Sequence, residues 1–250
     1  MAPLTPGASK GLEYHRLMAQ EESPQAATPE VHRTETVDRY LECVYYIAHE
    51  GETVRPSRLA DWLGVSAPTV SVNLQRLERD GWVRIARDRS VSLTPRGEEV
   101  AARIVRRHRL LERWLTDVLG LDWATADREA GRLSHGFSDL VLERLDGHLG
   151  QPVTCPHGNT IPGHPPRTHE LVALADLEPH TQATIARISE VAEHEAPELL
   201  HLLDTHGLVP GAVVEIEEME GGAGALAVRV GGQRVALGTS KARAIWVEVG

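Results

Sequence analysis

The sequence is poor in cysteine and has no long hydrophobic run, and each absence excludes a class of protein. Only two cysteines occur among 250 residues, Cys43 and Cys155, which leaves neither a disulfide framework nor a cysteine-rich zinc site. No apolar stretch reaches the length of about 18 residues that a transmembrane helix needs. The first residues lack the apolar segment of a secretory signal. We therefore expect a cytoplasmic protein with no membrane partner.

Catalytic motifs are absent as well. The sequence contains no GxSxG, HExxH or P-loop pattern, and no serine or cysteine nucleophile lies at a recognisable spacing from a histidine and a carboxylate. We therefore expect neither an enzyme nor a small organic substrate. A metallohydrolase built on carboxylates is the remote alternative.

What the sequence does contain is a helix-turn-helix pattern between residues 55 and 94. A short amphipathic segment over 57–63 ends at Gly64, a residue that tolerates positive φ at a helix end. Ser66 is a good N-cap for a second helix. Apolar residues recur in this helix at i, i+4 and i+7, the spacing of a buried stripe: Val70, Leu74 and Leu77.

A basic hairpin and a local excess of positive charge favour DNA binding. Two alternating segments flank the turn at residues 87–90, which predicts a wing. Residues 55–109 hold twelve arginines against six acids, a net charge of +6, whereas the whole chain has a net charge of −10. Helix-turn-helix patterns also occur in cores that never touch DNA, but a basic module inside an acidic protein is typical of a nucleic-acid reader.

We therefore expect a double-stranded DNA operator as the partner. The start of the second helix carries short hydroxyl, amide and apolar groups that suit phosphate and thymine-methyl contacts, while arginines suit phosphates. The candidate DNA-contacting residues are Arg55, Ser66, Pro68, Thr69, Ser71, Asn73, Arg76 and Arg89.

Composition and periodicity divide the chain into five segments. Residues 1–33 form a Pro-, Ala- and Glu-rich tail, 34–95 a winged helix-turn-helix, 96–150 a helical domain, and 151–169 a Pro/Gly linker. Residues 170–250 contain short alternating segments separated by glycines, which predicts a small β-barrel. The fold class is α+β.

The last segment is expected to contain one helix among its strands. Residues 170–192 alternate loosely like strands, and a short helix is predicted over 196–206. Thirteen acids against five basic residues between 170 and 250 give this segment a net charge of −8, so it would repel DNA and attract cations.

From residue 34 to residue 250, the chain resembles the diphtheria toxin repressor family of iron- and manganese-dependent transcriptional repressors. The resemblance rests on co-linear stretches such as SAPTVSVNLQRLERDGWV, DRSVSLTPRGEEVA, RRHRLLERWLTDVLGLD and HGNTIPG. It implies a winged helix-turn-helix, a helical dimerisation domain with two metal sites, and an SH3-like barrel of the ferrous-transport accessory type. It further implies a homodimer that binds a palindromic operator when loaded with metal.

The resemblance implies one metal site between the helical domain and the barrel. The i, i+4 and i, i+3 pairs involved would otherwise be interpreted as solvated helix faces. One imidazole and four carboxylates form a hard donor set that favours Mn²⁺, with Fe²⁺ second. The implied ligands are His108, Glu112, Asp127, Glu195 and Glu198.

The family's second, DNA-activating metal site departs from its pattern in this chain. The matching positions are Arg39, Gly131, Ser134 and His135, of which only His135 is a strong ligand. One possibility is a rearranged set drawn from Glu42, His108 and His135. The other is that Arg39 fills the space through an ion pair with Asp38, Glu42 or Glu129.

These observations leave two functional hypotheses. The first is a metal-dependent repressor that controls manganese or iron homeostasis genes. The alternative is a winged-helix regulator that is independent of metal or answers another signal, because the activating site is degenerate. Cys155 and His157 resemble half of a metal site, but with no second pair nearby we interpret them as part of a structural loop.

Overall fold

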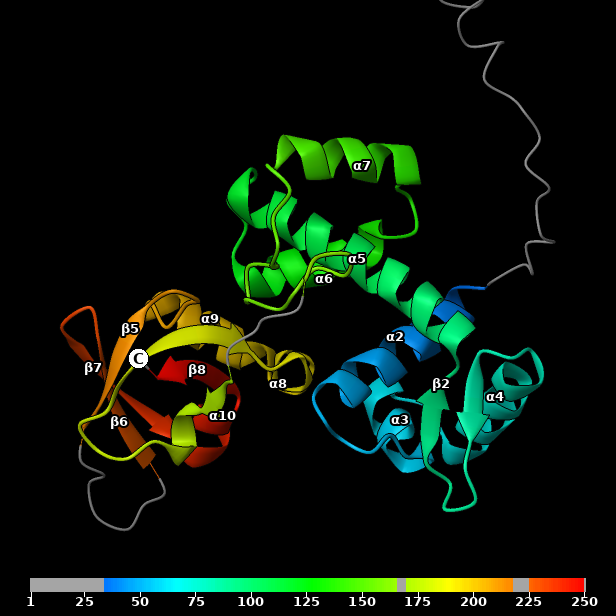
Figure 1. Cartoon of the computed structure of the whole chain (residues 1–250), viewed down its shortest axis with the longest axis horizontal. Helices are drawn as coiled ribbons and strands as arrows, with labels where there is room; N and C mark the ends of the chain where they lie inside the picture. Colours follow the sequence, from blue (N-terminus) through cyan, green and yellow to red (C-terminus); the bar gives the residue numbers. More distant parts are fainter. Residues whose placement is uncertain (1–33, 166–169, 218–224, 250) are drawn as a thin grey trace, which may run out of the picture. The chain divides into compact units, whose positions relative to one another are not determined.

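The computed structural model describes residues 34–165, 170–217 and 225–249 (Figure 1). The predicted tail, residues 1–33, lies outside the described residues. The expected fold class is confirmed, because helices and a separate antiparallel sheet follow one another along the chain.

The N-terminal elements are three helices and a hairpin, as the winged helix-turn-helix pattern predicts. The C-cap Gly64 has φ +64°, and the Ser66 hydroxyl accepts a hydrogen bond from the Thr69 amide at 3.4 Å. The buried helix faces and the hairpin share one apolar core. The elements are α2 (Glu35–His49), α3 (Pro56–Leu63), α4 (Ala67–Arg79), β1 (Val83–Ile85) and β2 (Val91–Leu93).

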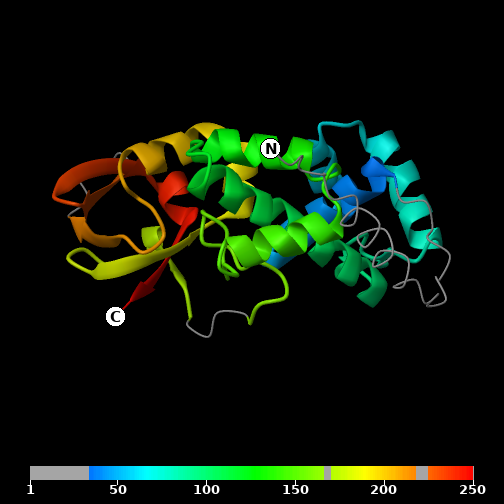
Figure 2. The same ribbon diagram turned by 90° about the horizontal axis from the view of Figure 1, so that it is seen from above.

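Three helices follow, and α6 and α7 both pack against the long helix α5 (Figure 1, Figure 2). The Thr94 hydroxyl caps α5, and a Cβ at Gly97 would lie 2.0 Å from the Trp82 carbonyl oxygen, so only glycine allows this close approach. Asp122 and Ser138 cap the next two helices. The bounds are α5 (Pro95–Asp117), α6 (Trp123–Leu133) and α7 (Asp139–His148).

The C-terminal part is a six-stranded antiparallel sheet with short helices. The strand order is β3-β8-β4-β5-β6-β7, and β4 bulges between Ile185 and Arg187. The strands are β3 (Val172–Ala173), β4 (Gln182–Ile188), β5 (Val213–Glu217), β6 (Ala225–Val230), β7 (Gln233–Gly238) and β8 (Ile245–Val249). The helices are the 3-10 turn η1 (Leu174–Asp176), α8 (Glu190–Glu195), α9 (Pro197–Thr205) and α10 (Thr239–Arg243).

Two details differ from the sequence-based expectation. The strand-like alternation was predicted to run to residue 192, but the Ser189 hydroxyl accepts a hydrogen bond from the Ala192 amide and starts helix α8 at Glu190. The segment predicted as a linker contains a buried turn, in which the exposed fraction is at most 4% at Cys155, His157, Asn159 and Ile161. The helix predicted over 196–206 is confirmed as α9.

Candidate functional site

A tight turn fixes His157 against strand β4. A Cβ at Gly158, which has φ +86°, would lie 2.2 Å from the Ala186 carbonyl oxygen, so the turn approaches the strand as closely as glycine permits. The Ile188 amide donates to the His157 carbonyl at 2.8 Å. The Asn159 side chain donates to the Ile188 carbonyl at 2.9 Å. The turn is therefore held to the barrel by backbone contacts on both sides of the His157 ring.

The His157 ring lies between two buried carboxylates. Its Nδ1 is 3.5 Å from Glu112 Oε1, on α5, and 3.3 Å from Glu193 Oε2, on α8. The Cys155 sulfur, Glu112 and His157 each place a ligand atom within 4.8 Å of the others. All four side chains are buried. Three segments that are distant in sequence thus converge on one imidazole.

This cluster fits a metal ion. Neither nitrogen of His157 has a hydrogen-bond partner among the described residues, although the ring is 0% exposed. A buried polar group without a partner is costly, and two buried carboxylates without a compensating charge are more so. Imidazole, thiolate and carboxylate are the donors that divalent transition metals take from proteins. A cation bound here would satisfy both the orphaned imidazole and the acids.

Electrostatics at the cluster are dominated by burial and by the neighbouring charges. Burial alone would raise the pKa of Glu112, but the imidazoles of His157 and His108 hold it below its usual range. Burial and the nearby charges of Glu190 and Glu112 raise the pKa of Glu193 well above normal. Burial and the same acids raise the pKa of the Cys155 thiol. Metal binding here therefore displaces protons.

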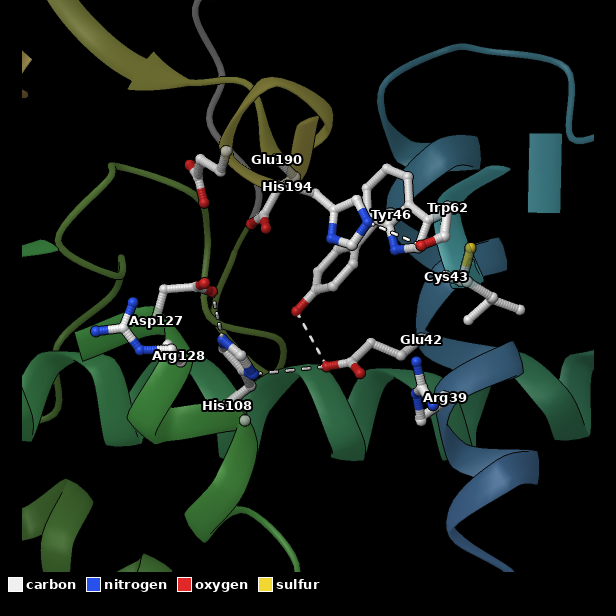
Figure 3. Close-up of a pocket in the computed structure, with 13 residues that line it drawn as sticks. Arg39, Glu42, Cys43, Tyr46, Trp62, His108, Asp127, Arg128, Glu190 and His194 are labelled. Carbon is white, nitrogen blue, oxygen red and sulfur yellow. Dashed lines mark hydrogen bonds and ion pairs between the residues drawn. The ribbon is translucent and has the colours of Figure 1, made fainter. Parts of the chain in front are cut away.

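A second group, built on His108, shares Glu112 with the first. His108 Nε2 lies 3.2 Å from Asp127 Oδ1, and its Nδ1 lies 3.7 Å from Glu42 Oε1 (Figure 3). The same Nε2 lies 3.5 Å from Glu112 Oε1. Burial would lower the pKa of His108, but hydrogen bonds to Asp127 and Glu112 raise it well above normal. A protonated imidazole cannot ligate. The His108 ring is hydrogen-bonded to Asp127, whereas the His157 ring has acids nearby but no hydrogen bond among the described residues.

The structure brings together three of the five residues that the resemblance implies as ligands, His108, Glu112 and Asp127. Glu198 is exposed on the first turn of α9 and belongs to neither metal-capable cluster of the described residues. The side chain of Glu195 lies outside the described residues. The acids on the barrel side that approach this region are instead Glu190, which is half-buried and paired with Arg109, and Glu193, which is buried.

The degenerate activating site borders a cavity of about 230 Å³ that Arg39, Glu42, His108 and Gly131 line (Figure 3). The expected partners of Arg39 are engaged elsewhere: Glu129 pairs with Arg132, and Glu42 accepts a hydrogen bond from the Tyr46 hydroxyl at 3.2 Å.

The other two positions of this site, Ser134 and His135, contact residues of the protein. His135 Nδ1 lies 4.0 Å from Asp38 Oδ2, and the Ser134 hydroxyl donates to the Gly131 carbonyl. The rearranged set of Glu42, His108 and His135 is not among the metal-capable clusters of the described residues.

The outward face of α4 differs in part from the predicted DNA-contacting set. Asn73 is half-buried, and its amide donates to the Tyr40 hydroxyl at 3.3 Å, so it ties α4 to α2. Val72 is 68% exposed, and Gln75 one turn later is exposed too. Helical spacing from the exposed Thr69 would have indicated both positions.

The remaining predicted residues stay on or beside this surface. Ser66 caps α4, Ser71 is half-buried, and Pro68, Thr69 and Arg76 are exposed. Arg55 donates to the Asp88 carbonyl at 3.0 Å, which joins α3 to the wing, and Arg89 stands at the wing's tip with φ +66°.

Comparison with known proteins gives three family matches in the order of the domains. Residues 32–91 match the iron dependent repressor N-terminal DNA binding domain, residues 94–163 its metal binding and dimerisation domain, and residues 172–249 the FeoA domain. The iron-dependent repressor IdeR of Mycobacterium tuberculosis is 37% identical over 225 residues, which covers 86% of this chain and 97% of the relative. The chain belongs to the iron-dependent repressor family.

Other members of the family are similarly close in sequence or structure. The diphtheria toxin repressor of Corynebacterium diphtheriae is 37% identical over 198 residues, or 75% of this chain and 86% of the relative. A solved manganese-dependent transcriptional repressor in complex with manganese superposes with a TM-score of 0.76 at 32% identity, covering 86% of this chain and 100% of that one.

Family membership confirms that part of the first functional hypothesis which concerns a metal-dependent, DNA-binding repressor. This iron-dependent repressor family member is a metal-dependent, DNA-binding transcriptional repressor that acts as a homodimer on a DNA operator, with divalent manganese or iron as cofactor. The family consists of transcriptional repressors, which are not enzymes. In the described part of the chain, no helix combines the length and apolarity needed to cross a membrane.

Proposed function

We propose that the chain is a cytoplasmic repressor of iron- or manganese-homeostasis genes, and that Glu112, Cys155, His157 and Glu193 hold its regulatory metal. The observation that carries this proposal is the His157 ring, which is fully buried beside two acids and a thiol and has no hydrogen bond to either nitrogen among the described residues. These residues would hold the ion from α5, the 155–159 turn and α8, and its positive charge would offset the charge of the acids Glu112 and Glu193.

His108 acts beside these ligands as an orienting residue. Its Nε2 faces the same Glu112 oxygen, Oε1, that faces His157. Asp127 contacts the same Nε2, and Glu42 contacts Nδ1 on the other side of the ring. Such outer partners typically alter metal affinity by about 10- to 100-fold when removed. A site with His108, Glu112 and Asp127 as direct ligands is the second arrangement, and it would require His108 to lose its proton.

Cys155 makes the proposed donor set softer than one imidazole with four carboxylates. Affinity of such mixed sites rises from Mn²⁺ to Fe²⁺, and thiolate widens that difference. We infer that Fe²⁺ binds this site more tightly than Mn²⁺. Which ion acts in the cell then depends on the supply of each.

The operator contacts come from α4 and the wing. Val72 offers its methyl groups to a thymine methyl, and Gln75 has the bidentate amide that pairs with adenine. Thr69, at the start of α4, contacts the sugar-phosphate backbone of the DNA, and Arg76 and Arg89 contact phosphates. Homodimerisation would present two copies of this surface to a palindromic site.

The proposal is tested by operator binding with and without metal. Fluorescence anisotropy on an operator duplex should show tight binding with Mn²⁺ or Fe²⁺ and loss of binding on chelation for the wild-type chain. The His157→Ala variant should bind the operator weakly both with metal and in chelator. His201→Ala, which changes an exposed histidine on α9, is the matched control and should behave as wild type. Wild-type binding that is unchanged by chelation would overturn the proposal in favour of metal-independent repression.

A further inference from the structure

Helix α8 makes contacts in three directions from only six residues. Glu190 accepts a hydrogen bond from Arg109 Nε on α5 at 3.0 Å. Glu193 faces His157 in the metal cluster. His194, the next residue, faces the DNA-binding domain. One short helix therefore touches both the proposed metal site and the helix-turn-helix.

The contact to the helix-turn-helix is a stacked pair of rings. The His194 and Trp62 rings have centroids 4.1 Å apart and planes inclined by 1°, and His194 Nε2 lies 2.9 Å from the Trp62 carbonyl oxygen (Figure 3). Trp62 lies near the end of α3, two residues before Gly64, where the chain turns into the recognition helix α4. Stacking plus a backbone contact fixes both the orientation and the distance of α8 relative to α3.

The other end of α8 is attached to the same domain. Arg187 makes a bidentate contact with Glu50, just after α2, with Nη1–Oε1 2.6 Å and Nη2–Oε2 3.3 Å. The backbone amide of Glu190 also donates to Glu50 Oε1, at 3.2 Å. The Arg187 side chain is only 18% exposed and the Glu50 side chain only 9%. Helix α8 is thus anchored to the DNA-binding domain both before its first residue and at its end.

We propose that Trp62 and His194 are positioning residues that transmit metal binding to the recognition helix. The proposal rests on the proposed function, because it takes Glu193 as a ligand. When the metal restrains Glu193, the adjoining His194 is restrained as well. Because His194 stacks on Trp62, this restraint fixes the position of α3 and, through the turn at Gly64, that of α4. Without the ion, no shared ligand joins Glu193 to Glu112 and His157, and α8 loses the restraint on that side. The metal would then favour the arrangement in which the contacts between α8 and the DNA-binding domain are made.

The test uses the full chain and separates metal binding from its consequence. His194 is exposed, so His194→Ala leaves no cavity in the core. We expect operator affinity in chelator to equal that of wild type, Mn²⁺ titration of the free protein to saturate as in wild type, and the Mn²⁺-induced gain in operator affinity to fall by about tenfold. His194→Phe keeps the ring and should restore most of the gain, and the control His201→Ala should keep all of it.

A double-mutant cycle gives the second measurement. If the His194–Trp62 stack couples metal binding to operator binding, His194→Ala should not reduce the Mn²⁺-induced gain in operator affinity any further in a Trp62→Leu background. The losses of the two single variants will then not add. Additive losses, or a wild-type gain in His194→Ala, would overturn the inference while leaving the proposed function intact. A wild-type chain with no Mn²⁺-induced gain would overturn both.

Discussion

The imidazole of His157 lies 3.3 Å from the carboxylate of Glu193, Nδ1 to Oε2, and both side chains are buried. His157 comes from a glycine-bounded turn and Glu193 from α8, so the contact joins two segments that the sequence separates by a stretch of barrel. With Glu112 on α5 as the third member, the fold concentrates buried metal-capable side chains at one point.

Removing a ligand should reduce metal affinity and change its selectivity. His157→Ala should weaken binding of Mn²⁺ and Fe²⁺ by more than the roughly 10- to 100-fold typical of an outer partner. Cys155→Ser replaces the thiol by a harder donor, so the preference for Fe²⁺ over Mn²⁺ should narrow. Competitive metal titration under anaerobic conditions measures both effects. An unchanged Fe²⁺/Mn²⁺ ratio in Cys155→Ser would show that the sulfur is not a ligand.

The stability of the metal-free chain should fall as pH rises. The folded chain has raised pKa values at His108 and Glu193, so the stability these groups contribute is present below their unfolded pKa values, 6.5 and 4.5, and is lost as pH climbs through the folded ones. Glu112, with its lowered pKa, acts in the opposite sense only below its unfolded value of 4.5.

Thermal unfolding checks this pH dependence. In chelator, Tm should decrease between about pH 6 and about pH 8, while the stabilisation by added Mn²⁺ should grow because protons compete less. A metal-free Tm that increases over this interval would contradict the assigned electrostatics.

The sequence predicted the N-terminal domain well and the metal cluster only in part, for physical reasons. Val70, Leu74 and Leu77 repeat within one helix, so local periodicity was enough to locate α4 and its buried face. Helix α8 has six residues, too few for a periodic stripe, and follows a strand directly. The acids Glu190 and Glu193 have the same i, i+3 spacing as the expected Glu195 and Glu198, and spacing alone cannot choose between them.

The position of Cys155 and His157 beside buried acids was not predicted, for a related reason. Glu112 lies 43 residues before Cys155, and Glu193 lies 36 residues after His157, so no local sequence motif contains these four residues. The glycine and prolines of this turn are typical of an exposed linker. The turn is buried instead, because Gly158 approaches β4 closely. Burial and convergence of this kind depend on tertiary packing.

Base recognition should depend on Val72 more than on Asn73. Val72→Ala removes apolar contact with the groove and should weaken operator binding by about fivefold, about 1 kcal/mol, with non-specific DNA unaffected. Asn73→Ala removes a hydrogen bond to Tyr40 inside the protein, so its cost should appear in Tm instead. Anisotropy on operator and scrambled duplexes distinguishes the two. Equal losses on both duplexes for Val72→Ala would argue against base contact.

Phosphate contacts should appear in the salt dependence of binding. Arg76→Ala and Arg89→Ala should each reduce the slope of log affinity against log salt concentration by about 1. Arg243→Ala, an exposed arginine on α10 in the barrel, is the control and should leave the slope unchanged.

The dimer interface should involve the apolar surface of α7 and the end of α5. Leu140 and Val141 on α7 are 63% and 46% exposed, and Leu119 beyond α5 is 52% exposed. Leu140→Glu should produce monomers in sedimentation velocity and lower operator affinity by more than about tenfold, because a monomer engages one half-site. Val213→Glu, at a 59% exposed valine of β5, is the matched control. A dimeric Leu140→Glu variant would place the interface elsewhere.

Anomalous diffraction from crystals of the full chain grown with Mn²⁺ would locate the regulatory ion directly. We expect an anomalous peak enclosed by Glu112, Cys155, His157 and Glu193, and loss of that peak in His157→Ala crystals. A peak beside Glu42, Asp38 and His135, with the His157 ring left unligated, would contradict it.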